Sequence, residues 1–310
     1  MTATLATDRS PESPTERTTA ANGTPRRPSL SPSRAADFKS CPLLYRFRTI
    51  DRLPEKKSRA AVRGTLVHSV LEKLYDLPPA RRTLDTAREL VAPAWEELRQ
   101  EDGVEELFAA AEDGTEPAGA GGLEEWLTSA GALVENYFTL EDPTRIQPAG
   151  REELVEVTLP DGLLLRGYVD RLDVAPTGAI RVVDYKTGAV PREAFEAKAL
   201  FQMKFYALVL WRTRGVVAAQ LKLLYLGDAD ALTYAPDEAE LVRFERTLQA
   251  IWAAIERAVA TGDFRANKSR LCGWCDHQAL CPAFGGTPPP FPAQAAAAAG
   301  WRTTLPVSPV

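Results

Sequence analysis

The heptapeptide VVDYKTG, Val182 to Gly188, ends an apolar run with an aspartate and a lysine one residue apart. Side chains alternate between the two faces of a strand, so Asp184 and Lys186 share one face and Tyr185 lies on the other. A carboxylate and an ammonium group therefore leave the strand side by side near its end. The simplest interpretation is an ion pair at a sheet edge, and the alternative is a site that carries chemistry.

Short β-branched segments bounded by Pro and Gly surround this heptapeptide. They cover 151–160, 162–176, 178–188 and 218–227, and the DG and PTG linkers predict that the first three form a meander. Helical spacing of apolar residues covers 31–40, 60–77, 192–212 and 237–262, with Ser31 or Ser33 as the N-cap of the first helix. This order of elements predicts an α/β fold with a mixed central sheet flanked by helices.

The chain has 310 residues and 45% hydrophobic content, enough for one large domain or one domain with an insert. Residues 1–28 are predicted to be a disordered tail, 80–142 an acidic helical insert without chemistry, and 285–310 a Pro-rich and then Ala-rich tail. No run approaches the roughly 20 apolar residues that span a bilayer, and the N-terminus has no secretory signal. We therefore expect a cytoplasmic protein with no membrane partner.

Charge is unevenly distributed along the chain. The net charge is −5, yet residues 81–142 hold 16 Asp and Glu against 4 Arg, so the remainder is net positive. Residues 40–66 hold seven Lys and Arg against two acids. Such a patch attracts polyanions, and it predicts DNA contacts by Arg46, Arg48 and Arg63. The alternative is an ordinary solvated surface.

A second aspartate belongs to the same candidate site. Asp170, in GYVDRLDV, shares a strand face with Tyr168 and Leu172, and an acid among apolar neighbours is unfavourable unless it is paired or bound to metal. Two such acids on neighbouring strands predict a Mg²⁺ or Mn²⁺ site with Asp170 and Asp184 as ligands and the Tyr185 carbonyl as a further ligand. Lys186 would then orient or deprotonate the attacking water, or stabilise negative charge in the transition state.

Two helices add polar side chains. His68 lies at the margin of an apolar stripe. It either supplies a nitrogen ligand to a metal or is a core residue whose ring nitrogens are hydrogen-bonded. Gly64, four residues earlier, allows a close approach of the backbone. Gln202 and Tyr206 share a helix face, where they contact phosphate or a base, or simply pack on the sheet.

The four cysteines have a one-plus-three spacing. Cys272, Cys275 and Cys281 form C-x2-C-x5-C, and Cys41 lies far upstream. Without an export signal, this set predicts a metal centre rather than disulfides. From the residues alone, the candidates are a zinc site and free thiols. Two-plus-two spacing is the usual pattern for zinc.

In combination, GTLVHSVLE, GYVDRLDV, VVDYKTG and FQMKFYALVLW resemble the PD-(D/E)XK nuclease superfamily, and within it the RecB-type exonuclease branch. That branch includes the nuclease domains of RecB and AddB and the CRISPR-associated adaptation nucleases. The opening LSPSRAADFKSCPLLYRFR is also similar, and the resemblance covers about residues 29–284. It implies a restriction-endonuclease-like fold. One departure is Val169, where the motif that names the superfamily has proline.

When the motif positions of the family are matched one by one to this sequence, the resemblance implies that His68, Asp170 and Asp184 are metal ligands. It also implies that Lys186 is the catalytic lysine. Gln202 and Tyr206 match the helix motif of the branch. The cysteines resemble the clasp of AddB and the adaptation nucleases, which implies a four-iron four-sulfur (4Fe–4S) cluster that joins the two ends of the domain. Glu153 is a weaker candidate for an extra carboxylate.

These features and the resemblance together predict a metal-dependent DNA exonuclease in DNA repair or recombination, and the resemblance implies that it acts on single-stranded ends. Tyr45 and Phe47 stack on bases in this interpretation, or pack in the core. The chain has no GxxxxGK(S/T) loop, so we expect no ATP site and a possible helicase in trans. The rival hypotheses are a silent DNA-binding or assembly module and a zinc-clasped hydrolase of another substrate.

Overall fold

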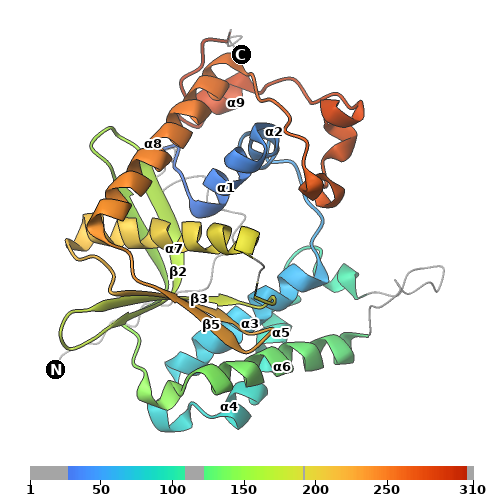
Figure 1. Ribbon diagram of the computed structural model, residues 1–310. Helices are drawn as coiled ribbons and strands as arrows, with labels where there is room; N and C mark the ends of the chain where they lie inside the picture. The colour runs from blue at the N-terminus through green and yellow to red at the C-terminus, as the bar shows by residue number, and fades with distance from the viewer. Residues whose placement is uncertain (1–26, 109–121, 191–192, 306–310) are drawn as a thin grey trace, which may run out of the picture.

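A five-stranded mixed sheet forms the centre of the protein. The computed structural model describes residues 27–108, 122–190 and 193–305 (Figure 1). The strand order in the sheet follows the chain, and neighbouring strands are antiparallel except for the parallel pair β3 and β4. The predicted mixed sheet is confirmed. Its strands are β1 (Gly150–Thr158), β2 (Leu164–Val174), β3 (Ile180–Lys186), β4 (Gln220–Tyr225) and β5 (Asp230–Tyr234).

The connections explain this sheet order. β1, β2 and β3 form the predicted meander, and Gly162 (φ 89°) and Gly178 (φ 85°) supply the left-handed backbone in the two turns. Parallel strands need a long crossover, which here is helix α7 (Glu193–Arg214) between β3 and β4. The short β5 was not predicted. It follows β4 through a tight turn in which Ala229 has a φ of 52°.

Helices cover both faces of the sheet (Figure 1). One face carries α1 (Pro32–Ser40), α2 (Pro42–Tyr45), α7 and α8 (Glu238–Thr261), with a π-helical turn at Arg46–Ile50 after α2. The other face carries α3 (Arg59–Asp76), α4 (Leu84–Glu89), α5 (Val91–Leu98) and α6 (Leu123–Leu140). Within the described part of the chain, no helix has the length and apolar character needed to cross a membrane.

Two hydrophobic cores lie on the two faces. β3 contributes to both, because Val182 packs with α7 and α8, whereas Val183 and Tyr185 pack with α3 and α6. The alternation predicted for this strand is therefore observed. It directs Asp184 toward α7 and the Tyr185 ring toward α3.

The helices of the acidic segment 80–142 are not peripheral. α5 and α6 pack against α3 through Trp95, Trp126 and Tyr137, and residues 109–121 lie outside the described residues. In its described residues the segment forms helices that supply most of one layer of the fold. Three short 3₁₀ turns accompany it, at Pro79–Arg81, Glu105–Leu107 and Pro143–Arg145.

The predicted C-terminal tail folds as far as residue 305. Phe291 stacks on Phe264 with 5.8 Å between ring centroids, and Trp301 packs on Trp252 at 5.0 Å. Helix α9 (Ala293–Ala298) lies between these contacts. The aromatic residues dispersed in this Pro- and Ala-rich sequence dock it on the core. The predicted N-terminal tail, 1–28, lies outside the described residues up to residue 26.

Candidate metal centre and active site

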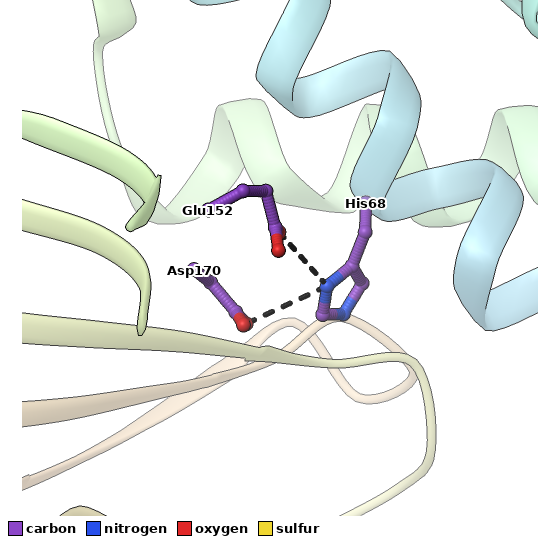
Figure 2. A group of neighbouring side chains, drawn as sticks. All are labelled: His68, Glu152 and Asp170. Carbon is purple, nitrogen blue, oxygen red and sulfur yellow. Dashed lines mark ion pairs between the residues drawn. The ribbon is translucent and has the colours of Figure 1, made fainter. Parts of the chain in front are cut away.

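Three side chains from three elements converge at one end of the sheet (Figure 2). His68 comes from α3, Glu152 from β1 and Asp170 from β2, and their ligand atoms lie within 4.8 Å of one another. His68 Nδ1 is 3.5 Å from Asp170 Oδ2 and 3.9 Å from Glu152 Oε1. The structure thus brings together two predicted ligands and adds a carboxylate that sequence reasoning missed.

Strand register places Glu152 in this group. β1 and β2 pair in register on both sides of it, so Glu152 lies opposite Asp170. Its φ is 42°, a left-handed conformation that non-glycine residues rarely adopt. The weaker candidate Glu153 instead pairs with Arg214 at 3.0 Å. The hairpin register is the one feature from which Glu152 could have been found, because partners across an antiparallel pair share a face.

The backbone of Tyr185 borders the same group. Its N–H donates to Asp170 Oδ2 at 2.8 Å, and its carbonyl oxygen lies 3.0 Å from His68 Nε2. As a hydrogen bond, the second contact has Nε2–H as donor, because a carbonyl only accepts. Because Nδ1 is the nitrogen that faces Asp170 and Glu152, the contact of Nε2 with the carbonyl orients the His68 ring. The carbonyl of Tyr185 as a metal ligand stays a prediction.

Electrostatics favour a cation at this position. Burial raises the pKa of Asp170 to about 7, and the charge of Asp184 adds to the rise. Burial alone would lower the pKa of His68, but a hydrogen bond with Glu152 and the charges of Asp170 and Asp184 raise it to about 9. Crowded carboxylates repel one another, and a hard divalent cation relieves that repulsion.

Asp184 and Lys186 leave β3 toward α7. Lys186 Nζ lies 2.5 Å from Asp184 Oδ2, and the Asp184 residue is only 1% exposed. Gln202 of α7 binds both partners: its Nε2–H donates to Asp184 Oδ1 at 2.9 Å, and its Oε1 accepts from Lys186 Nζ at 2.9 Å. The ion pair is present, but it lies on an interior strand rather than at a sheet edge. The Gln202 amide holds both of its members.

Both oxygens of Asp184 are already engaged within the protein. Oδ1 accepts from the Gln202 amide, and Oδ2 lies 2.5 Å from the Lys186 ammonium. A buried carboxylate is held ionised by such partners. Asp184 lies outside the group of three defined above, although its charge acts on both Asp170 and His68. This donor set fits Mg²⁺ or Mn²⁺.

Gln202 and Tyr206 have positioning contacts. The Gln202 amide N–H also donates to Tyr206 Oη at 3.0 Å, so the amide is engaged by three side chains. Burial raises the pKa of Tyr206, which keeps its phenol neutral. A Cβ at Gly167 of β2 would lie 2.9 Å from the Tyr206 ring, so glycine permits this packing. In this structure the Gln202 amide makes these contacts within the site, and its predicted contact with a phosphate stays a prediction.

The predicted DNA contacts near α2 need correction. Tyr45 and Phe47 are fully buried, so the core-packing alternative describes them. Arg46 is also buried, because its guanidinium lies 2.9 Å from Asp51 and donates to the Pro289 carbonyl at 2.5 Å. These three side chains are not available to a nucleic acid at the surface.

The other two predicted arginines are engaged by the protein. Arg48 pairs with Asp37 and with Glu55, each at 2.7 Å. Arg63 donates to Ser129 Oγ at 3.2 Å. Acids nearby in sequence pair with Arg46 and Arg48, and Lys57 pairs with the distant Glu101 at 3.0 Å, so part of the positive charge of 40–66 is compensated.

The four cysteines gather where the two ends of the domain meet. Cys41 lies between α1 and α2, and its Sγ accepts from the Asn267 N–H at 3.4 Å. Burial raises the pKa of the Cys275 thiol, and Cys272, Cys41 and Cys281 are close enough to raise it further. 3₁₀ turns at Arg270–Trp274, Gln278–Leu280 and Pro282–Phe284 surround them. We call residues 264–285 the clasp segment.

Comparison with known proteins places the chain in a family. The sequence profile of the PD-(D/E)XK nuclease superfamily matches residues 29–282. The Gene 69 proteins of Mycobacterium phages D29 and L5 are 26% and 24% identical to this chain, and each alignment covers 83% of this chain and 97% of the relative.

One solved structure has the same fold. It is the crystal structure of a candidate exonuclease from Eubacterium rectale, with a TM-score of 0.54 and 14% identity, covering 80% of this chain and 87% of that one. At this identity the likeness shows a shared fold and no more.

Proposed function

The chain belongs to the PD-(D/E)XK nuclease superfamily, and on that basis we propose that it is a Mg²⁺- or Mn²⁺-dependent deoxyribonuclease. We further propose that it is an exonuclease acting on single-stranded ends, such as those formed in repair and recombination. The observation that carries the proposal is the convergence of His68, Glu152 and Asp170 beside the Asp184–Lys186 pair.

The metal would be held by His68, Glu152, Asp170 and Asp184, with the Tyr185 carbonyl as a further ligand. When bound, it supplies a Lewis acid for the phosphate and lowers the pKa of a bound water. The protein's part is to hold these groups in place before DNA arrives. The Tyr185 N–H fixes one oxygen of Asp170, and Gln202 fixes one oxygen of Asp184.

Lys186 would stabilise the negative charge that develops on the scissile phosphate. Its ammonium is held by Asp184 and Gln202, so little reorganisation is needed when the charge appears. Tyr206 supports the Gln202 amide from the far side. Gln202 and Tyr206 are therefore assigned as positioning residues rather than groups that contact the phosphate.

We propose that Cys41, Cys272, Cys275 and Cys281 bind a 4Fe–4S cluster with a structural role. The clasp segment brings Cys272, Cys275 and Cys281 near Cys41, whose Sγ accepts from the Asn267 N–H at 3.4 Å. The one-plus-three spacing of these cysteines supports the cluster over zinc, for which two-plus-two spacing is usual.

The cluster is tested by colour. The protein purified without oxygen should be brown and absorb broadly near 400 nm, as 4Fe–4S proteins do. A colourless protein that contains one zinc per chain would instead support the zinc clasp. Cys281→Ser should remove the absorbance without changing residues of the metal centre.

The nuclease proposal is tested with end-labelled single-stranded DNA and Mg²⁺, Mn²⁺ or EDTA. Lys186→Ala and Asp170→Ala should each reduce the rate by at least about 100-fold, the usual effect of removing one group that stabilises a transition state. Lys204→Ala is a matched control, because this lysine lies on α7 and pairs with Glu240 outside the site. Closed circular duplex should resist, since it has no ends.

Two other results would favour the rival functions. DNA binding without degradation by the folded, brown wild type would favour a silent binding module or a nuclease that needs a helicase in trans. Equal degradation of linear and closed circular DNA would refute the exonuclease assignment while leaving a nuclease.

A further inference from the structure

Trp274 is the most exposed large apolar side chain of the described residues, at 82%. The chain has six tryptophans, and Trp95, Trp126, Trp252 and Trp301 each pack on another ring, while Arg212 covers Trp211. Across the described residues, Trp274 has no such ring or cation contact. Leaving an indole in water is unfavourable, so this position calls for an explanation.

The backbone beneath Trp274 is well held. It lies in the 3₁₀ turn Arg270–Trp274, between Cys272 and Cys275 of the proposed cluster, and the Cys275 N–H donates to the Cys272 carbonyl at 3.2 Å. Exposure here is therefore a property of the fold rather than of a free chain end. Leu271 and Phe284, both in the clasp segment, extend the apolar surface at 49% and 42% exposure.

The charge of the clasp segment suits a polyanion. Residues 264–285 contain three basic side chains, of which Arg265 pairs with Asp263 at 3.1 Å, leaving Lys268 and Arg270, against one acid. Lys268 Nζ lies 4.8 Å from the centre of the Phe284 ring, so a cation accompanies the exposed aromatics. The single acid, Asp276, is engaged by the Lys56 N–H at 3.0 Å.

The clasp segment contacts the connection that leads into α3. His277 Nε2 lies 3.1 Å from Glu55 Oε1 in that connection, and α3 carries His68. Figure 1 shows the orange clasp segment beside this connection.

We infer that Trp274 is a stacking platform for a base of single-stranded DNA, with Lys268 and Arg270 contacting the adjacent phosphates. The inference rests on the proposed nuclease function and adds a substrate contact outside its active site. Every base has a π face, so such a platform tolerates any sequence. Bases within a duplex are already stacked on both faces, which is why the platform favours single strands.

The test measures DNA affinity while cleavage is blocked by EDTA. The full chain with its cluster is titrated into fluorescein-labelled oligothymidylate of about 20 nucleotides, longer than the binding site of a typical module. Trp274→Ala should raise the Kd about 10-fold, within the range of about 5- to 150-fold that stacking of one base is worth. Trp274→Phe should recover most of the loss.

Three controls separate stacking from other effects. Leu271→Ala, in the same turn but without a π face, should change the Kd less than about 2-fold. An abasic oligomer of the same length should bind equally to wild type and Trp274→Ala. Lys268→Ala should lower the slope of log Kd against log salt concentration by about 0.7, as the loss of one contact to a single strand does.

The result also distinguishes this inference from the nuclease proposal. Hydrolysis of a small p-nitrophenyl ester of thymidine monophosphate should be the same for Trp274→Ala and wild type. If wild type hydrolyses the ester but Trp274→Ala binds the oligomer as tightly as wild type, the inference is wrong and a protein partner becomes the occupant of this surface. If wild type hydrolyses neither ester nor DNA, the nuclease proposal fails, whereas the Kd comparison still decides the role of Trp274.

Discussion

Among single residues, Glu152 combines a carboxylate of the candidate metal centre with a left-handed backbone, φ 42°. Such a conformation costs a non-glycine residue about 1 kcal/mol, and residues of this kind concentrate at functional sites. Glu152 lies opposite Asp170, and in this backbone conformation its carboxylate lies beside His68. We infer that the strain is tolerated because it positions this carboxylate. Stability and metal binding should therefore respond in opposite directions to substitution here.

We predict that Glu152→Gly weakens Mn²⁺ binding at least about tenfold while leaving the free energy of unfolding unchanged or raising it by up to about 1 kcal/mol. Glycine relieves the backbone strain, whereas the lost carboxylate removes a ligand. Titration calorimetry and denaturant unfolding measure the two quantities.

Glu153→Gly is the matched control for Glu152→Gly. Glu153 is adjacent on β1, lies outside the left-handed region and pairs with Arg214. Its replacement should lower stability by about 0.5–1 kcal/mol and leave Mn²⁺ binding unchanged. Equal behaviour of the two variants in both measurements would remove the case for strain at the metal centre.

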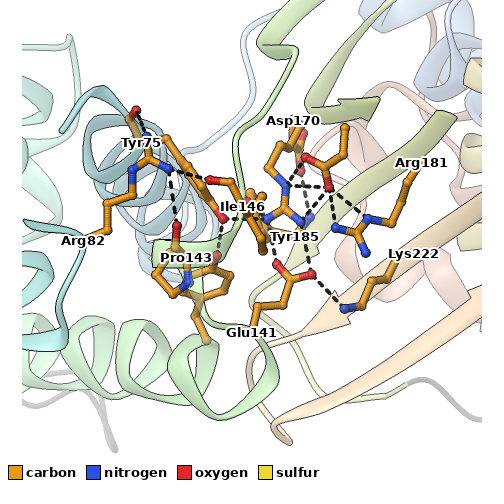
Figure 3. Close-up of polar contacts among 12 residues, drawn as sticks. Tyr75, Arg82, Glu141, Pro143, Ile146, Asp170, Arg181, Tyr185 and Lys222 are labelled. Carbon is orange, nitrogen blue, oxygen red and sulfur yellow. Dashed lines mark hydrogen bonds and ion pairs between the residues drawn. The ribbon is translucent and has the colours of Figure 1, made fainter. Parts of the chain in front are cut away.

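At the scale of elements, strand β2 serves both faces of the sheet. Asp170 lies in the candidate metal centre, and the next residue, fully buried Arg171, contacts an ionic network against α3 and α6. Figure 3 shows Glu141, Tyr185 and Lys222 of this network. Arg171 binds Glu141 at 2.7 Å and the Tyr185 hydroxyl at 2.8 Å. Lys222 of β4 also binds Glu141 at 2.7 Å. The network thus joins the α6 end to the strands that hold the site.

The network predicts a particular dependence of stability on pH. Burial alone would raise the pKa of Glu141, but Arg171 and then Lys222 lower it below its ordinary value of 4.5. The unfolded chain therefore takes up this proton first as the pH falls. The stabilisation is complete above about pH 4.5 and is lost as the pH falls through the folded pKa.

We expect Glu141→Gln to flatten the acid side of the curve of unfolding free energy against pH. Denaturant unfolding from about pH 7 down to about pH 3 measures this curve, covering the window in which a glutamate titrates. Glu156→Gln, at an exposed position of β1, is the control and should leave the shape unchanged. Parallel curves for wild type and Glu141→Gln would show that the carboxylate is not held ionised by Arg171.

For the whole molecule, the two ends of the described chain close around the same core. Near the N-terminus, Leu30 exchanges backbone hydrogen bonds with β2, and Asn267 Nδ2 donates to the Ser40 carbonyl at 2.8 Å. Beyond the clasp segment, Thr304 N–H donates to the Ala260 carbonyl at 3.1 Å. Stability should therefore depend on residues far from the catalytic motifs.

We predict that deletion of residues 285–310 lowers the free energy of unfolding by at least about 2 kcal/mol. It removes Phe291 from Phe264 and Trp301 from Trp252, and each aromatic pair contributes about 0.5–1.5 kcal/mol beyond the burial of its rings. Denaturant unfolding measures the loss, and deletion of residues 306–310 alone is the control. Unchanged stability after the longer deletion would restore the interpretation of this segment as a tail.

Much of the fold was predictable because its determinants are local. The period-two and helical patterns identify four of the five strands and the long helices, and the DG and PTG turns predict the meander. The same patterns place Asp184 and Lys186 on one face, with Gln202 and Tyr206 on the helix that meets it. β5 was missed because five residues are too few for a clear period.

The sequence by itself determined which residue types stand at the ends of which strands and helices, because alternation and helical spacing are properties of neighbouring residues. Only the tertiary structure decided that Glu152, and not Glu153, faces His68, since that depends on the register between two strands. Only the tertiary structure decided that Tyr45 and Phe47 are buried while Trp274 is exposed. Burial depends on which distant segments cover a side chain, and no local pattern encodes that.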